Sequence, residues 1–152
     1  MPFDRDSAGF RWPVRVYWED TDAGGIVYHT AYLRFAERAR TEMLRAAGID
    51  QSRLLAETGM AFAVARMEVD FKRPAVLDDA LEVAVHLAEL AQASLRLTQV
   101  IRRGSDELVR LAVRLACIDR RGRPVRMPRD VGAAIAEQTG HSRLDTTRPV
   151  LA

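Results

Sequence analysis

The sequence predicts a two-layer α+β domain in which an antiparallel sheet covers one long helix. Between residues 30 and 47, apolar residues recur at helical spacing, and charged residues occupy the opposite face. After residue 60, four stretches alternate apolar and polar residues, and the short turns between them favour antiparallel pairing. Because the helix has a single broad apolar stripe, one sheet face is enough to bury it.

The predicted elements follow one another along the whole chain. Residues 14–18 (VRVYW) predict a first strand, and the long helix then runs for about four turns to Gly48, a residue type common just after helix ends. A short second helix is expected over 51–57. The alternating runs cover 63–71, 81–87, 95–101 and 109–117, with a turn at 104–106, and PRDVGAAIAE (128–137) predicts a terminal helix with proline at its first position.

The charged face of the long helix is expected to lie in solvent. Single arginines stand among acids there, as with Arg40, and Arg38 and Glu42 have the spacing of an i,i+4 ion pair. We therefore expect one domain over residues 1–138, followed by a mobile tail over 139–152, where no periodicity is present.

Composition narrows the functional classes. The chain has 48% apolar and 29% charged residues, the balance of a soluble globular domain, and its formal net charge of +2 gives no indication of a nucleic-acid partner. No apolar run is long enough to span a bilayer, and the N-terminus lacks the apolar stretch of a secretory signal. These features predict a cytoplasmic protein.

Cysteine chemistry is nearly excluded. Cys117 is the only cysteine, which rules out an internal disulfide and CxxC metal sites, and it falls on the apolar face of a predicted strand. We expect a buried, unreactive thiol. The sequence implies no metal and no redox cofactor.

Residues 19–29 (EDTDAGGIVYH) concentrate three carboxylates, two glycines and His29 between the first strand and the long helix. The simplest interpretation is structural: an aspartate caps the helix and the glycines take positive φ angles. Three mutually repelling acids exceed what a turn needs, however, and paired glycines let a ligand approach the backbone. The start of the helix also offers unpaired amides.

These groups suit acyl transfer. Amides at a helix N-terminus stabilise a developing oxyanion, often by about 3 kcal/mol per donor. A nearby carboxylate can attack a carbonyl carbon or take a proton from water. Since the sequence has no GxSxG and no HExxH, an aspartate of this segment is the candidate by elimination.

The segment RVYWEDTDAGGIVYHTAYLRFAERARTEML resembles the signature of hotdog-fold acyl-CoA thioesterases of the 4-hydroxybenzoyl-CoA thioesterase superfamily. The similarity begins at FRWPVRVYWEDTDAGG, continues through ARMEVDFKRPAVLDDALEV and reaches about residue 130. Within the superfamily it is most similar to the branch associated with the Tol-Pal envelope system of Gram-negative bacteria.

The resemblance implies a hotdog fold, in which an antiparallel sheet wraps a central helix. It also implies dimers joined sheet edge to sheet edge, with active sites at the interface, and often tetramers. By correspondence with the family motif, Asp22 is the catalytic carboxylate and His29 a second active-site group. The backbone at Tyr28 and His29 polarises the thioester carbonyl, and Gly25 allows the substrate to approach.

The resemblance leaves the contacts to coenzyme A open. Some relatives bind the nucleotide through an arginine-rich turn before a serine, whereas here Ala91-Gln92-Ala93 precedes Ser94. Ser94 therefore stays a candidate, and Arg121, Arg123 and Arg126 are possible substitutes for the missing arginines. Because another hotdog branch uses a glutamate within the helix, Glu37 and Glu42 are rival carboxylates ranked below Asp22.

The predicted function is hydrolysis of acyl-CoA thioesters, with acyl-carrier-protein thioesters as alternative substrates. Asp22 acts as nucleophile or general base. The rival hypothesis is a hotdog module that binds acyl-CoA without hydrolysing it.

Overall fold

The computed structural model describes residues 9–140, which form five strands and three helices. In chain order the elements are β1 (Phe10–Arg15), a 3₁₀ turn (Trp18–Asp20), α1 (His29–Ala46), α2 (Gln51–Thr58), β2 (Ala61–Phe71), β3 (Ala80–Leu90), β4 (Ser94–Arg103), β5 (Asp106–Ile118) and α3 (Arg129–Gln138).

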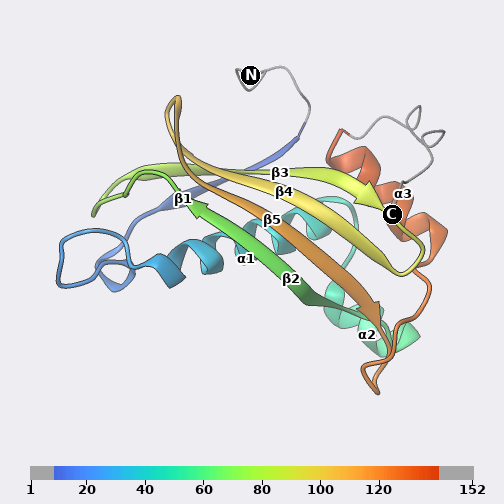
Figure 1. Cartoon of the computed structure of the whole chain (residues 1–152). Helices are drawn as coiled ribbons and strands as arrows, with labels where there is room; N and C mark the ends of the chain where they lie inside the picture. The colour runs from blue at the N-terminus through green and yellow to red at the C-terminus, as the bar shows by residue number, and fades with distance from the viewer. Residues whose placement is uncertain (1–8, 141–152) are drawn as a thin grey trace.

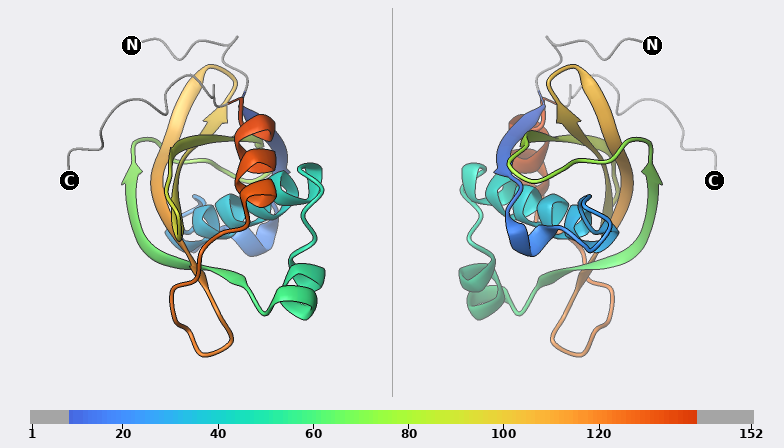
Figure 2. Two further views of the ribbon diagram at one scale, coloured as in Figure 1. Left: turned by 90° about the vertical axis from the view of Figure 1, so that its right-hand side faces the viewer. Right: turned by 90° about the vertical axis from the view of Figure 1, so that its left-hand side faces the viewer.

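All five strands belong to one antiparallel sheet with the order β1-β3-β4-β5-β2. The sheet curves around α1, and all three helices lie on its concave side (Figures 1 and 2). β2 and β3 are consecutive in the chain but are separated in the sheet by β5 and β4, so residues 72–79 carry the chain across. The predicted architecture, a sheet wrapped around a long helix, is confirmed.

α1 packs on the sheet through the apolar stripe that the sequence predicts. Phe35, Ala36 and Ala39 are completely buried. They belong to one hydrophobic core with the inward-facing residues of β3, β4 and β5. The helix has 18 residues, about five turns instead of the four expected, and lies within one residue of the predicted range. Gly48 follows it with φ 80°, the left-handed conformation expected beyond a helix end.

The first strand lies earlier than predicted. Residues 14–18 were expected to be extended, but β1 ends at Arg15 because the amide of Tyr17 donates to the carboxylate of Asp20 (2.8 Å) and turns the chain. The strand begins before Pro13, which is tolerated because β1 forms an edge of the sheet.

The remaining elements agree closely with their predicted ranges. α2 ends at Thr58, and Gly59 (φ 73°) closes it. α3 begins at Arg129, with Pro128 as its N-cap instead of its first residue. Thr139, the first residue of the expected tail, is buried and caps α3 through a hydrogen bond to the carbonyl of Ile135. Residues 141–152 of that tail lie outside the described residues.

Two polar predictions for α1 are wrong. Arg40 is not on a solvated face: it is only 7% exposed, and it donates to the side-chain oxygen of Gln99 on β4 (3.0 Å). Gln99 in turn donates to the carbonyl of Ala36 (2.9 Å). Glu42 pairs with Arg45 instead of Arg38.

The Arg40–Gln99 contact places a cation in the core opposite a neutral amide, and burial lowers the pKa of Arg40. We expect Gln99→Leu to lower the free energy of unfolding by about 1–3 kcal/mol, because it leaves the guanidinium without its acceptor. Adding Arg40→Met should restore most of the loss. Urea unfolding of both single variants and the double variant measures this coupling; strictly additive losses would contradict it.

Among the carboxylates of the described residues, Glu107 has the most strongly shifted pKa. The hydrogen bonds from Arg110 (2.5 and 3.1 Å) outweigh the effect of burial and, together with Lys72, lower the pKa of Glu107 to about 2. This anchors the connection after β2 to the start of β5.

The low pKa of Glu107 predicts a pH-dependent contribution to stability. Since the pKa is lowered from 4.5 to about 2 on folding, the contribution is complete above pH 4.5 and is lost as the pH falls toward 2. Glu107→Gln should therefore be less stable than the wild type by roughly 2–3 kcal/mol at pH 7, with the gap closing on acidification. Urea midpoints across this pH range measure it; a constant gap would refute it.

Candidate active site

The predicted reactive segment folds as a small hairpin that leads directly into α1. Thr21 and Val27 form an isolated antiparallel bridge. On one side of this bridge the amide of Asp22 donates to the carbonyl of Ile26 (3.0 Å), and on the other the amide of Tyr28 donates to the carbonyl of Asp20 (2.8 Å). Asp22 is therefore two residues, about 7 Å of extended chain, from the point where the hairpin joins the helix.

The two positions at the hairpin tip require glycine for different physical reasons. Gly25 has φ 80°, a conformation that side chains disfavour, and its amide donates to the carbonyl of Asp22 (3.0 Å). Gly24 donates its amide to the Asp22 carboxylate (2.8 Å), and a Cβ at this position would lie 3.1 Å from that carboxylate oxygen. Gly24 thus lets the carboxylate fold back over the turn.

The acidic residues of the segment differ in their exposure to solvent. Asp20 is only 3% exposed; its carboxylate accepts the amide of Tyr17 and lies 3.8 Å from the guanidinium of Arg34. Asp22 and Glu19 are exposed to solvent. Asp20 therefore has a structural role, and Asp22 is a solvent-accessible carboxylate fixed by a backbone amide.

His29 is the first residue of α1, and Tyr28 is its N-cap. Tyr28 makes no side-chain capping hydrogen bond, and the first turn contains no acidic residue, so the positive end of the helix dipole is not neutralised there. The imidazole lies edge-on to the rings of Tyr28 (4.5 Å between centroids) and Phe71 (6.2 Å). Phe71 is the last residue of β2, so the sheet edge reaches the start of the helix.

A buried contact that the sequence did not reveal holds the hairpin against α1. The carbonyl of Ala75 accepts the amide of Val27 (2.9 Å), and the amide of Ala75 donates to the hydroxyl of Tyr32 (2.9 Å). All three residues are buried, and burial raises the pKa of Tyr32. Because Tyr32 is one helical turn after His29, this link fixes the hairpin relative to the helix N-terminus.

The other candidate residues lie elsewhere. Ser94 begins β4 opposite Ala116, whereas Phe71 is opposite Val109, so within one chain Ser94 is seven residues along β5, or about 23 Å, from the His29 end of the sheet. Glu37 and Glu42 border a shallow groove on the solvent side of α1.

Three hydrogen bonds order the arginine-rich turn after β5. Arg120 donates to the carbonyl of Leu55 (3.0 Å) on α2, and the Asp119 carboxylate accepts the amides of Arg121 and Arg123 (both 2.9 Å). Asp119 is thus satisfied by the backbone of the turn, and this turn, like Ser94, lies at the end of the sheet away from His29.

The described part of the chain shows neither a reactive cysteine nor a metal-binding cluster. Cys117 is completely buried, and burial raises the pKa of its thiol to about 11, as expected for an unreactive side chain. Within residues 9–140, no three histidine, cysteine or acidic side chains are grouped so as to hold a metal ion. None of the helices in this range combines the length and hydropathy that a bilayer crossing requires.

The comparisons with known proteins agree with this geometry. A family model described as the thioesterase-like superfamily matches residues 16–135. The acyl-CoA thioesterase YbgC of Haemophilus influenzae is 45% identical over 127 residues, which are 83% of this chain and 93% of that protein. The acyl-CoA thioester hydrolase YbgC of Escherichia coli O6:H1 is 50% identical over 111 residues, covering 72% and 82%.

A solved structure shows the same fold. The crystal structure of a probable thioesterase from Bartonella henselae superposes with a TM-score of 0.77 at 37% identity, covering 80% of this chain and all of that one. A sheet wrapped around a helix that opens on an acidic, glycine-rich hairpin defines a thioesterase domain of the hotdog fold. The chain belongs to the thioesterase-like superfamily. The predicted fold and the prediction of a thioester hydrolase are confirmed.

The contact between Gly24 and Asp22 generates a test of the hairpin geometry. In Gly24→Ala the added methyl group must displace the Asp22 carboxylate, so we expect thioester hydrolysis to fall roughly tenfold with little change in melting temperature. Gly48→Ala, after the other end of α1, is the matched control: it meets no neighbouring atom but strains the backbone, so it should cost about 1 kcal/mol of stability and leave hydrolysis unchanged. Equal activity of Gly24→Ala and wild type would show that the displacement does not matter.

Proposed function

We propose that the chain hydrolyses the thioester bond of acyl-CoA substrates, with Asp22 as the catalytic carboxylate. The observation that carries the proposal is the exposed Asp22 carboxylate, held by the Gly24 amide in the hairpin that opens α1. The relatives in H. influenzae and E. coli are named for acyl-CoA thioester hydrolysis, which supports the same substrate class here.

Two routes are compatible with this placement. As a general base, Asp22 takes a proton from water while the water oxygen bonds to the carbonyl carbon; the C–S bond then breaks and the thiolate is protonated. As a nucleophile, a carboxylate oxygen of Asp22 bonds to the carbonyl carbon and expels the thiolate, and water hydrolyses the resulting anhydride. Both routes give a free acid and a thiol.

The residues around Asp22 receive complementary roles in this proposal. The backbone amide of His29, in the first turn of α1, stabilises the charge that develops on the carbonyl oxygen. The imidazole of His29, oriented by Tyr28 and Phe71, positions the thioester or protonates the leaving sulfur. Gly25, which has open space around its Cα, allows the acyl carbonyl to approach the hairpin.

The wider biological setting is proposed from the resemblance of the sequence. We place the enzyme in the cytoplasm as a homodimer or homotetramer, in the branch associated with the Tol-Pal envelope system. Acyl-carrier-protein thioesters are alternative substrates because their reacting group is the same thioester. Ser94 is the candidate contact for the coenzyme A portion.

Asp22→Asn tests the proposed catalytic carboxylate. Asparagine keeps an oxygen that can accept the Gly24 amide but removes the charge, so the hairpin should persist while turnover falls at least about 100-fold. Thiol release from a panel of short-chain, long-chain and aromatic acyl-CoA esters measures the effect. The matched control is Glu19→Gln, a neighbouring exposed acid that should leave turnover unchanged.

The outcomes of this experiment separate the possible functions. Wild-type rates in Asp22→Asn would move the chemistry to another carboxylate, with Glu37 and Glu42 tested next. Tight binding of acyl-CoA without any thiol release from the wild type, across all esters, would favour the non-catalytic binding module.

A further inference from the structure

Three arginines stand side by side across the outer face of the sheet. The strand register pairs Arg96 of β4 with Arg114 of β5, and Arg114 with Arg66 of β2. All three are exposed, whereas Val113 and Leu115, the neighbours of Arg114 along β5, are buried in the core. The arginines therefore lie on the convex face, and the three described helices lie on the other, concave side (Figures 1 and 2).

Two β-bulges place charged residues in line with Arg114. In β2 the register shifts just before Arg66. Without this bulge Arg66 would be opposite Val113, on the buried side of the sheet, and the bulge turns it to the exposed side beside Arg114. A second bulge, just before Glu89 in β3, places that residue opposite Arg96. One line of charges thus crosses four strands.

This arrangement sets like charges directly opposite one another, which is unfavourable in a sheet. Adjacent strands are about 4.8 Å apart, so the Cα atoms of the three arginines span about 10 Å. The outer two have carboxylate neighbours: Arg66 lies 2.8 Å from Glu68, and Arg96 lies 3.5 Å from Glu89. Arg114 stands between them, and within residues 9–140 no carboxylate is paired with it. Three arginines against two glutamates leave one positive charge in excess.

The surroundings of Arg114 favour a compact anion with several phosphate groups. Its neighbours on the same face of β5 are the short side chains of Ala112 and Ala116, so its guanidinium can be reached from solvent. The planar guanidinium fork matches phosphate oxygens in pairs. Glu68 and Glu89 stand beside the arginines, so a broad acidic protein surface would meet like charges there, whereas a short phosphate chain fits between them.

We propose that this arginine row (Arg66, Arg114 and Arg96) binds a small molecule through a chain of two or more phosphate groups, as in a free nucleoside diphosphate. Binding replaces the repulsion among the three guanidinium groups by charge-assisted hydrogen bonds to phosphate oxygens. The inference goes beyond the proposed hydrolysis and does not depend on it, because binding to the row is measured without turnover.

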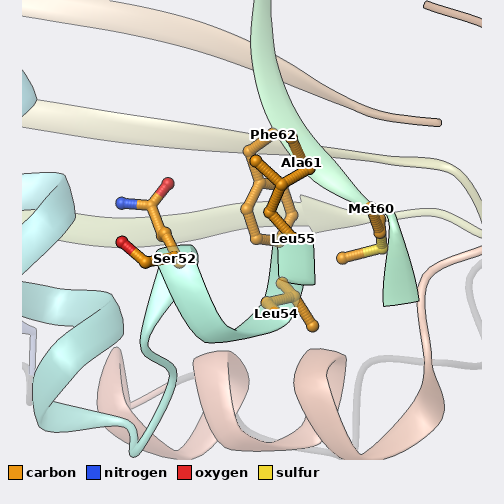
Figure 3. Close-up of a pocket in the computed structure, with 7 residues that line it drawn as sticks. Ser52, Leu54, Leu55, Met60, Ala61 and Phe62 are labelled. Carbon is orange, nitrogen blue, oxygen red and sulfur yellow. The ribbon is translucent and has the colours of Figure 1, made fainter. Parts of the chain in front are cut away.

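The arginine row is separate from the candidate active site of the same chain. Arg114 is five residues along β5, about 17 Å, from Val109, the residue opposite Phe71, and it faces away from α1. The pocket between α2 and the start of β2 offers no alternative phosphate site. All of its lining side chains, Leu55 and Phe62 among them, are uncharged (Figure 3).

Calorimetric titration of the full chain with pyrophosphate and with ADP tests the proposal. Arg114→Gln should weaken the binding of both at least about tenfold, because it removes the central charge-assisted hydrogen bonds. Glu68→Gln should tighten binding about threefold, because it releases Arg66 from its ion pair. The matched control is Arg53→Gln, which removes an exposed, paired arginine of α2 and should leave both affinities unchanged.

Contrary outcomes of the titration are equally specific. A wild type that binds neither compound, or equal losses in Arg114→Gln and Arg53→Gln, would overturn the inference. Binding of a polyglutamate peptide without binding of pyrophosphate would replace it with an acidic protein partner. Coenzyme A carries the same phosphate chemistry, so the KM for acyl-CoA distinguishes the source: an unchanged KM in Arg114→Gln supports a free ligand, and a raised KM contradicts a separate site.

Thermal unfolding gives an independent test of the repulsion. At about 20 mM salt, Arg114→Gln should raise the melting temperature by about 1–4 °C, because it removes the central like charge. At 1 M salt the difference should disappear, since charges are screened beyond about 3 Å. Millimolar pyrophosphate should raise the melting temperature of the wild type and leave that of Arg114→Gln unchanged. A variant that is no more stable than the wild type at low salt would contradict the proposal.

Discussion

The position of the candidate active site depends on the buried carboxyl residue Asp20. Its side chain accepts the amide of Tyr17, which ends the extended course of β1, and its carbonyl accepts the amide of Tyr28 immediately before α1. A buried carboxylate is costly unless it is hydrogen-bonded, so this residue strongly favours a single local geometry. Asp20 therefore fixes both the point where the chain leaves β1 and the point where α1 begins.

This constraint explains why several acids occur in so short a segment. Asp20 is buried, and one of its carboxylate oxygens accepts a backbone amide while the other lies near Arg34. Asp22, two residues later on the hairpin, is exposed to solvent with one oxygen held by the Gly24 amide. The chain thus separates a structural carboxylate from an accessible one. The second link, from Val27 through Ala75 to Tyr32, fixes the hairpin that carries Asp22 against the first turns of α1 through buried, uncharged groups.

Local periodicity predicted most elements because apolar residues recur along one face, which is buried in α1 and in β3 to β5 and only partly buried in β2. The apolar stripe of α1 and the alternating strands β2 to β5 were found for this reason. Long-range contacts left no such signal. The end of β1 depends on Asp20, and the burial of Arg40 depends on Gln99, which is 59 positions away in the chain. A single arginine among acids looks the same in sequence whether it faces solvent or an amide in the core.

The candidate site was also predictable only in part. Asp22 and His29 stand in one continuous motif, but Phe71 reaches His29 only because the sheet order places β2 at the edge beside β5. Phe71 at the end of β2 contacts His29, whereas Phe62 near its start borders a pocket that Leu55 of α2 also lines. Because β2 pairs with β5 from Ala61 to Phe71, the distance between these two ends is set by the backbone of the sheet, which holds its spacing more rigidly than loops do.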